Sequence, residues 1–157
     1  MSANETRIEI DDRVPLVRIT REFDAPPARV FAAWTEPALV VRWLGPRDRT
    51  TEVERYDAVT GGSYRYVHRR GEDEQWFRGC FHDVRPGELL VQTFTWEGMP
   101  DHVALETMRF VNLGGGRTRI ESTSLVDSFE SRDAFVASGM EHGIRESYDK
   151  LDELLAR

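Results

Sequence analysis

The side chains in this sequence with the broadest chemistry are four histidines and one cysteine. His68, His82, His102 and His142 are far apart and match no metal-ligand spacing, and Cys80 has no second cysteine beside it. Zinc binding normally needs three or four such ligands, arriving as recognisable pairs. The spacing therefore argues against a metal centre, and nothing in the sequence calls for a cofactor.

Nucleophilic and phosphate chemistry also lack their signatures. Alternation along the segment around Cys80 places Phe77, Gly79 and Phe81 inward and Cys80 outward, with no base or helix N-terminus to activate the thiol. No Gly-x-Ser-x-Gly elbow is present. The glycine run Gly114–Gly116 lacks a lysine and a following helix, so it predicts a hairpin turn rather than a phosphate loop.

What remains is a set of aromatic and polar side chains that share strand faces with one another. Apolar walls carrying a few convergent polar groups are typical of small-molecule sites. Buried polar groups without partners cost about 1–3 kcal/mol each, so they either pair with one another or line a pocket. The candidate wall residues are Trp43, Tyr64, Tyr66, His68, Phe81, Gln92, Phe94, Met108, Phe110, Ser122 and Tyr148.

The same pattern has a plainer interpretation, in which these side chains simply fill the core. Trp43 in particular is expected to pack rather than to bind. Gly139 and Gly143 lie beside the apolar stripe of the last predicted helix, where a glycine costs roughly 1 kcal/mol relative to alanine. They indicate either close approach of helix to sheet or room for a ligand, and the sequence leaves both open.

The elements that must position these residues follow from hydrophobic periodicity. A strand at 16–23 precedes two short helices, the first capped by Asp24 and the second opening at Thr35-Glu36-Pro37. Six strands follow, at 51–56, 63–69, 75–84, 89–96, 103–111 and 117–125. A long helix over 131–156 closes the chain, with Asp127 or Ser128 as its cap.

A lone amphipathic helix of this length must bury its stripe, and the concave face of the sheet is the one apolar surface large enough. The sequence therefore predicts an α+β helix-grip fold: a curved antiparallel sheet of about seven strands around a long C-terminal helix. Residues 15–157 are predicted to form one domain, and the polar residues 1–14 a flexible segment.

Composition limits the partners and the cellular location that we expect for this domain. The 157 residues are 39% hydrophobic and 31% charged, with a formal net charge of −7. An acidic surface repels phosphate backbones and anionic lipids, so no nucleic-acid partner is expected. No apolar run approaches ~18 residues and the N-terminus lacks the pattern of a signal peptide, so no membrane insertion is expected. A single cysteine suits a cytoplasmic location.

Three segments resemble the START/Bet v 1-like superfamily, in the branch named for the C-terminal domain of the Hsp90 ATPase activator. They are Ala25–Thr35, Arg42–Pro46 and Gly139–Leu151, and Gly61–Tyr66 matches as well. The second segment is similar to the family's Trp-Trp-Gly-Pro signature, with Leu44 at the second aromatic position. The resemblance covers roughly residues 15–156, and it supports the helix-grip prediction.

The resemblance implies a carrier or receptor for a small hydrophobic or amphipathic molecule, because the superfamily includes many such proteins. It leaves two alternatives. One is a cyclase or dehydratase acting on a polyketide-like substrate, with His68 as general base or acid and Tyr66 as hydrogen-bond donor. The other is a chaperone-associated protein, although only about 15 residues precede the first strand, where the eukaryotic activator carries a large domain. Relatives are often dimers, so a homodimer is also expected.

Overall fold

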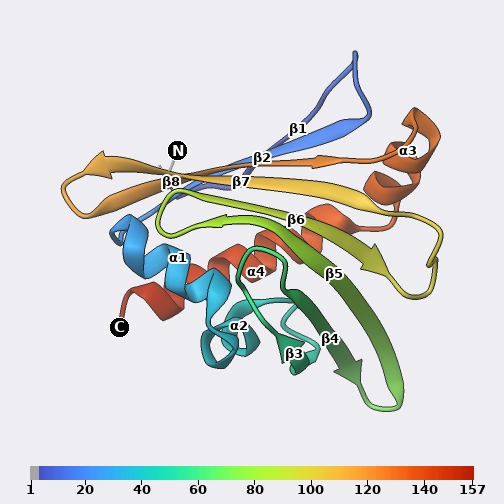
Figure 1. The fold of residues 1–157 in the computed structure, drawn as a ribbon, viewed down its shortest axis with the longest axis horizontal. Helices are drawn as coiled ribbons and strands as arrows, with labels where there is room; N and C mark the ends of the chain where they lie inside the picture. The colour runs from blue at the N-terminus through green and yellow to red at the C-terminus, as the bar shows by residue number, and fades with distance from the viewer. Residues whose placement is uncertain (1–3) are drawn as a thin grey trace.

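The computed structural model describes residues 4–157, which form one curved sheet and four helices (Figure 1). The helices are α1 (Pro27–Thr35), α2 (Pro37–Trp43), α3 (Phe129–Ala137) and α4 (Met140–Leu155). The strands are β1 (Arg7–Ile10), β2 (Leu16–Phe23), β3 (Thr50–Tyr56), β4 (Ser63–Arg70), β5 (Asp73–Arg85), β6 (Leu89–Trp96), β7 (Ala104–Gly114) and β8 (Arg117–Leu125).

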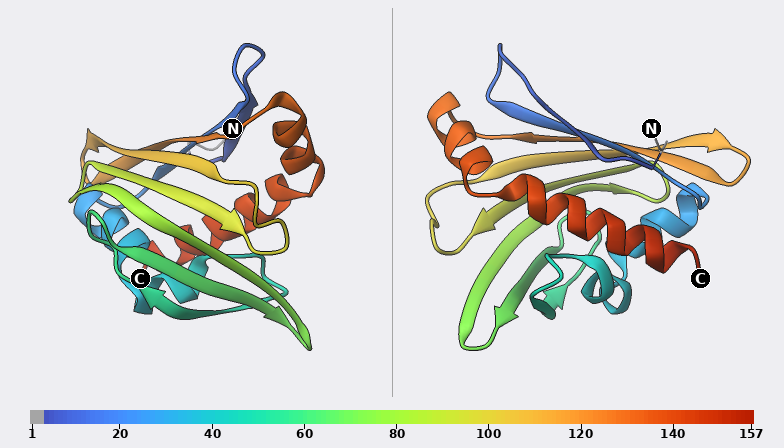
Figure 2. Two further views of the ribbon diagram at one scale, coloured as in Figure 1. Left: turned by 45° about the vertical axis from the view of Figure 1, so that its right-hand side comes forward. Right: turned by 180° about the vertical axis from the view of Figure 1, so that it is seen from behind.

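All neighbouring strands pair antiparallel, in the order β1-β2-β8-β7-β6-β5-β4-β3. The strands from β3 to β8 form a meander, and β2 joins it by pairing with β8 in the register Arg18↔Thr123. The sheet curls so that α4 runs across its concave side (Figure 2). This arrangement confirms the predicted helix-grip fold. Within residues 4–157 no further strand pairs with the edge strands β1 and β3, and the homodimer stays a prediction.

The eighth strand lies where the sequence predicted a flexible segment, so the prediction for residues 1–14 was wrong for Arg7–Ile10. These residues pair along β2, from Arg7↔Thr20 to Ile10↔Val17. Strand β1 is too short and too polar to give a clear hydrophobic alternation, but pairing satisfies its backbone groups and lets Ile8 pack against the core. Residues 1–3 of the predicted flexible segment lie outside the described residues.

Helix α1 begins differently from the prediction. Its N-cap is Pro26, and no side chain caps it. Asp24 instead forms an ion pair with Arg117, at 2.9 Å between Oδ1 and Nε. Proline fixes φ near its helical value and has no N–H to satisfy, which starts the helix without a capping side chain.

The predicted single C-terminal helix is two helices. Ser128 caps α3, as expected, by accepting a hydrogen bond from the Ser131 amide at 3.0 Å. The chain then breaks at Gly139, whose φ of 87° lies in the left-handed region that favours glycine. Gly139 is therefore the hinge between α3 and α4, and it does not lie inside a helix. Gly143 lies inside α4, as predicted.

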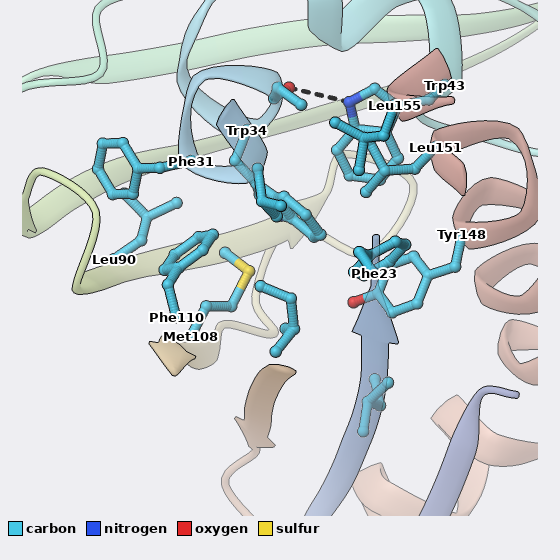
Figure 3. Packing of buried hydrophobic residues seen from close by; sticks show 14 of the residues in the cluster. Phe23, Phe31, Trp34, Trp43, Leu90, Met108, Phe110, Tyr148, Leu151 and Leu155 are labelled. Atoms are coloured by element: carbon cyan, nitrogen blue, oxygen red, sulfur yellow. Dashed lines mark hydrogen bonds between the residues drawn. The ribbon is translucent and has the colours of Figure 1, made fainter. Parts of the chain in front are cut away.

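One end of the molecule is densely packed (Figure 3). Trp34 of α1 lies edge-on to Phe23 and Tyr148, with ring centroids 6.3 and 5.8 Å away. Trp43 of α2 is 2% exposed and donates a hydrogen bond from its indole nitrogen to the Ala33 carbonyl at 2.9 Å. These contacts fix the two short helices against α4, and Trp34, Trp43 and Tyr148 also form one end of the cavity that continues between the sheet and α4.

None of the helices in the described part of the chain is long and apolar enough to cross a membrane.

Candidate ligand-binding cavity

A cavity of about 530 Å³ lies between the sheet and the N-terminal half of α4. Its volume falls within the range of small-molecule sites, roughly 300–1,000 Å³. Strands β4 to β7 supply most of one wall, and α2, the end of α3 and α4 supply the other. The space thus lies where the concave sheet faces the least densely packed part of the helix.

Nine of the sequence-predicted residues lie on the wall of this cavity. They come from four strands and two helices that are distant in the sequence. They are Trp43, Tyr64, Tyr66, His68, Gln92, Phe94, Met108, Ser122 and Tyr148. The fold brings them together because strand alternation directs the seven strand side chains to the concave face, which α2 and α4 cover with Trp43 and Tyr148.

Phe81 and Phe110 do not reach the cavity, which corrects their prediction as wall residues. Phe81 is 1% exposed and its ring lies 5.3 Å from that of Tyr64. Phe110 is 5% exposed and packs 5.1 Å from the Phe31 ring. Alternation identifies the face on which a side chain lies, but not its distance from the end of the sheet that the short helices fill.

Four rings line the sheet side of the cavity in a nearly continuous series. Tyr64 and Tyr66 stack at 5.9 Å between centroids, Tyr66 and Phe77 at 5.3 Å, and Phe77 and Phe94 at 5.4 Å. The interplanar angles are 15° to 26°, so the rings lie in similar orientations. Such a wall offers a large apolar area and the electron-rich faces of the rings.

Glu106 on β7 is a cavity residue that the sequence analysis missed. Its carboxylate accepts a hydrogen bond from Gln92 Nε2 at 3.0 Å. The side chain is half-buried because it borders the cavity, and burial raises the pKa of this carboxyl to about 7. Glu106 lies two residues before Met108, on the same strand face, so the alternation that identified Met108 also indicates Glu106.

Four tyrosines surround this carboxyl. Burial raises the pKa of Tyr56, Tyr64, Tyr66 and Tyr148, and the negative charge of Glu106 raises it further. All four are therefore neutral hydroxyls at physiological pH. Two are already engaged: Tyr56 donates to the Trp34 carbonyl at 2.9 Å, and Tyr64 to that of Thr93 at 2.6 Å. Within residues 4–157 the hydroxyls of Tyr66 and Tyr148 have no hydrogen-bond partner.

The tautomer of His68 follows from its partners. The Thr51 hydroxyl donates its single proton to the Leu44 carbonyl at 2.7 Å, so it must accept from His68 Nδ1 at 2.9 Å. Nε2 therefore carries a lone pair. The ring lies close to the backbone of Gly45, where a Cβ would be 2.6 Å from His68 Cε1, so glycine leaves the room that the imidazole occupies.

The pKa of His68 differs from the one that the catalytic hypothesis assumes. Burial, with smaller contributions from Lys150 and Arg49, lowers the pKa of this imidazole to about 4. The catalytic alternative rests on the unperturbed pKa of an imidazole, which lies nearest neutrality, and burial moves the pKa of His68 away from it. In this cavity the group that titrates near neutrality is Glu106.

At the rim, the cavity meets solvent among polar side chains. Arg49 pairs with Asp73 at 2.6 Å, and Trp96 donates from its indole nitrogen to Gln75 Oε1 at 2.9 Å. Trp96 is 40% exposed. The rim therefore has a neutralised cation, whereas the interior has a carboxyl.

The described residues contain no group of three or more histidine, cysteine or acidic side chains that could hold a metal ion. Cys80 is exposed on β5, and its amide nitrogen donates to the Thr93 hydroxyl at 2.9 Å.

Comparison with known proteins identifies the family. Residues 24–156 match the family described as Activator of Hsp90 ATPase homolog 1-like protein. The chain therefore belongs to this family, and the resemblance seen in its sequence segments is confirmed. Proteins with this fold commonly bind hydrophobic ligands. Among curated proteins, none matches the chain.

Solved structures from several bacteria share the fold. A protein from Rhodobacter sphaeroides superposes with a TM-score of 0.86 at 27% identity, covering 96% of this chain and 97% of its own. A protein from Arthrobacter aurescens superposes with a TM-score of 0.88 at 25% identity, covering 96% and 91%. Protein Ms6760 from Mycobacterium smegmatis reaches 0.86 at 20% identity, covering 96% of both chains. These likenesses span nearly the whole length of each chain.

Proposed function

We propose that the protein binds a small hydrophobic or amphipathic molecule in the cavity between the sheet and α4. The observation that carries the proposal is the cavity itself, whose mostly apolar wall includes a few polar atoms without protein partners. At the other end, where α1, α2 and the C-terminal end of α4 pack together, the pocket that remains is smaller, about 210 Å³. Burial of an apolar ligand here contributes about 25 cal/mol per Å² removed from water.

Gly143 offers a way to test this proposal without disturbing the core. It lies on the cavity wall, and a Cβ built there would have no heavy atom within 4 Å. A leucine at this position would project into the cavity from a helix that it also stabilises. Gly143→Leu should therefore remove ligand space and keep the fold.

The test is a fluorescence titration with N-phenyl-1-naphthylamine, a neutral apolar probe that brightens in apolar sites. We expect saturable binding to the wild type, retained in Gly143→Ala, and at least about tenfold weaker in Gly143→Leu, which corresponds to about 1.4 kcal/mol. Thermal unfolding of the three proteins controls for folding. No saturable binding to the wild type, or equal binding to Gly143→Leu, would contradict a ligand site in this cavity.

A further inference from the structure

We propose that the cavity is selective for apolar molecules that carry a protonated amine, with Glu106 as the counter-charge of the ammonium group. This inference rests on the proposed function and names the class of ligand. It starts from the carboxyl of Glu106, whose one hydrogen-bond partner in the described chain is the amide of Gln92.

No cation of the described chain neutralises Glu106. Arginine pairs with many of the carboxylates on the surface, but none of the ion pairs among residues 4–157 includes Glu106. The groups that face it are the amide of Gln92 and the tyrosine hydroxyls on β3, β4 and α4. A carboxylate removed from water without a counter-charge is costly, so a ligand cation would supply what the protein lacks.

The two arginines nearest to the cavity are paired with carboxylates, and Lys150, which lies near His68, does not line the cavity. Arg49 lies at the rim and pairs with Asp73, and with Lys150 it acts on His68. Arg21 faces Tyr148 from the packed end and pairs with Asp149 and Asp152 at 2.8 and 3.4 Å. The interior is therefore negative when Glu106 is ionised.

Two further atoms, both on side chains that line the cavity, can accept a hydrogen bond but have no donor within residues 4–157. An ionised Glu106 requires the amide NH₂ of Gln92 to point at it, which leaves Gln92 Oε1 without a partner although the side chain is 8% exposed. His68 Nε2 carries the second lone pair. An ammonium group has three N–H donors and no acceptor, so it can satisfy these acceptors, and the unpartnered hydroxyls of Tyr66 and Tyr148 can also accept from it. Arg49 Nη1, at the rim, is a donor without an acceptor in the described chain.

The aromatic wall favours the same kind of ligand. The stacked rings of Tyr64, Tyr66, Phe77 and Phe94 border the cavity that Glu106 enters. The faces of such rings attract a cation within about 6 Å, most strongly where water is excluded. A carboxylate beside several ring faces binds an alkylammonium through charge, hydrogen bonds and ring contacts together, whereas it binds an alcohol through hydrogen bonding alone.

The test compares three ten-carbon probes that differ in the head group: decylamine, decanol and decanoate. Titration calorimetry at pH 8, below the critical micelle concentrations, measures the dissociation constant of each for three proteins. These are the wild type, Glu106→Gln and the control Glu88→Gln, which alters an exposed carboxyl between β5 and β6. Circular dichroism confirms that each variant is folded.

We expect decylamine to bind the wild type and Glu88→Gln at least about tenfold more tightly than decanol, and decanoate to bind most weakly. In Glu106→Gln the ratio of decylamine to decanol should fall to about one. Lowering the pH from 8 to 5.5 should weaken decylamine binding to the wild type by up to about thirtyfold, because the proton then competes with the amine for Glu106.

The failures of the two proposals are distinguishable. Equal binding of decylamine and decanol to the wild type, or an amine preference that survives in Glu106→Gln, overturns the amine inference but leaves a hydrophobic site. Tighter binding of decanoate overturns it as well, in favour of a ligand acid at Arg49. No binding of any probe overturns both the inference and the proposed function.

Discussion

The two halves of α4 face the same sheet, but one half packs into the core and the other lines the cavity. In the C-terminal half, Tyr148, Leu151 and Leu155 are buried against α1, α2 and the sheet, with exposures of 7, 0 and 4%. In the N-terminal half, Met140 and Ile144 are partly buried, and Gly143 has open space beside it. The apolar stripe of α4 thus packs into the core at one end and covers the cavity at the other.

Aromatic side chains show the same division. At the packed end, Trp34 meets its neighbours nearly edge-on, and the rings interlock (Figure 3). Along the cavity, the rings from Tyr64 to Phe94 stack in similar orientations and line the space between the sheet and α4. The comparison teaches that residue type alone does not distinguish filling from lining. We expect the packed half to hold most of the stability and the hollow half to be adaptable.

The largest effect should come from shortening one leucine in the packed half. Leu151→Ala should lower the free energy of unfolding by about 2–5 kcal/mol, because a fully buried side chain leaves a cavity that its neighbours cannot fill. Ile144→Ala should cost clearly less, about 1–2 kcal/mol, since Ile144 already borders open space. Urea unfolding monitored by tryptophan fluorescence measures both. Equal losses would show that the two halves are energetically alike.

The next effect concerns the buried carboxyl. The pKa of Glu106 is raised from 4.5 to about 7 in the folded protein, so the native state binds the proton more tightly than the unfolded state does. This contribution makes stability fall as the pH rises from 4.5 to 7, by about 3 kcal/mol at most. Glu106→Gln should therefore match the wild type near pH 4.5 and exceed its stability by about 2–3 kcal/mol at pH 8.

His68 opposes this trend in the wild type. Its pKa is lowered from 6.5 to about 4, so the unfolded state binds the proton more tightly and stability rises with pH between 4 and 6.5. Glu106→Gln should expose that rise. Urea unfolding midpoints of the wild type and of Glu106→Gln at pH 4.5, 6 and 8 test the opposing contributions of Glu106 and His68. A gain in the variant that is the same at all three pH values would mean that Glu106 is not desolvated.

The smallest effect separates the two glycines of the C-terminal helices. Gly143 has ordinary helical geometry and open space, so Gly143→Ala should stabilise by up to about 1 kcal/mol. Gly139 has a φ of 87°, so Gly139→Ala should destabilise by about 1 kcal/mol. Thermal unfolding of the two variants gives opposite shifts of a few degrees. Shifts of the same sign would contradict the hinge at Gly139.

The order of elements was predictable because each strand alternates and each turn carries glycine or proline. The bounds of β2, β6 and β8 agree with the predicted ranges. The strand β1 and the break at Gly139 escaped prediction for a physical reason. A short polar edge strand gains its stability from pairing with another strand, which its own residues do not indicate. A single glycine beside an apolar stripe is compatible with the interior of a helix and also with its end.

The sequence predicted on which face of the sheet a side chain lies, but not whether that side chain reaches the cavity. Tyr64, Tyr66 and Gln92 were found because alternation places them on the concave side, where the structure has them. Phe81 and Phe110 obey the same alternation but lie under other rings. Glu106 also obeys it, and was missed because a charged residue in a strand suggests a solvent-facing position. Its location depends on the empty space opposite, which no local pattern encodes.

The pairing of β2 with β8 has a consequence for how the chain folds. The residues of Arg18↔Thr123 are separated by about a hundred positions, whereas the strands from β3 to β8 close through short hairpins. Loop closure over such a distance is entropically expensive, so local hairpins form before it. We expect the meander to assemble first and β2 to dock late. On the ribosome, β2 would wait for almost the whole chain to be synthesised before it finds its partner.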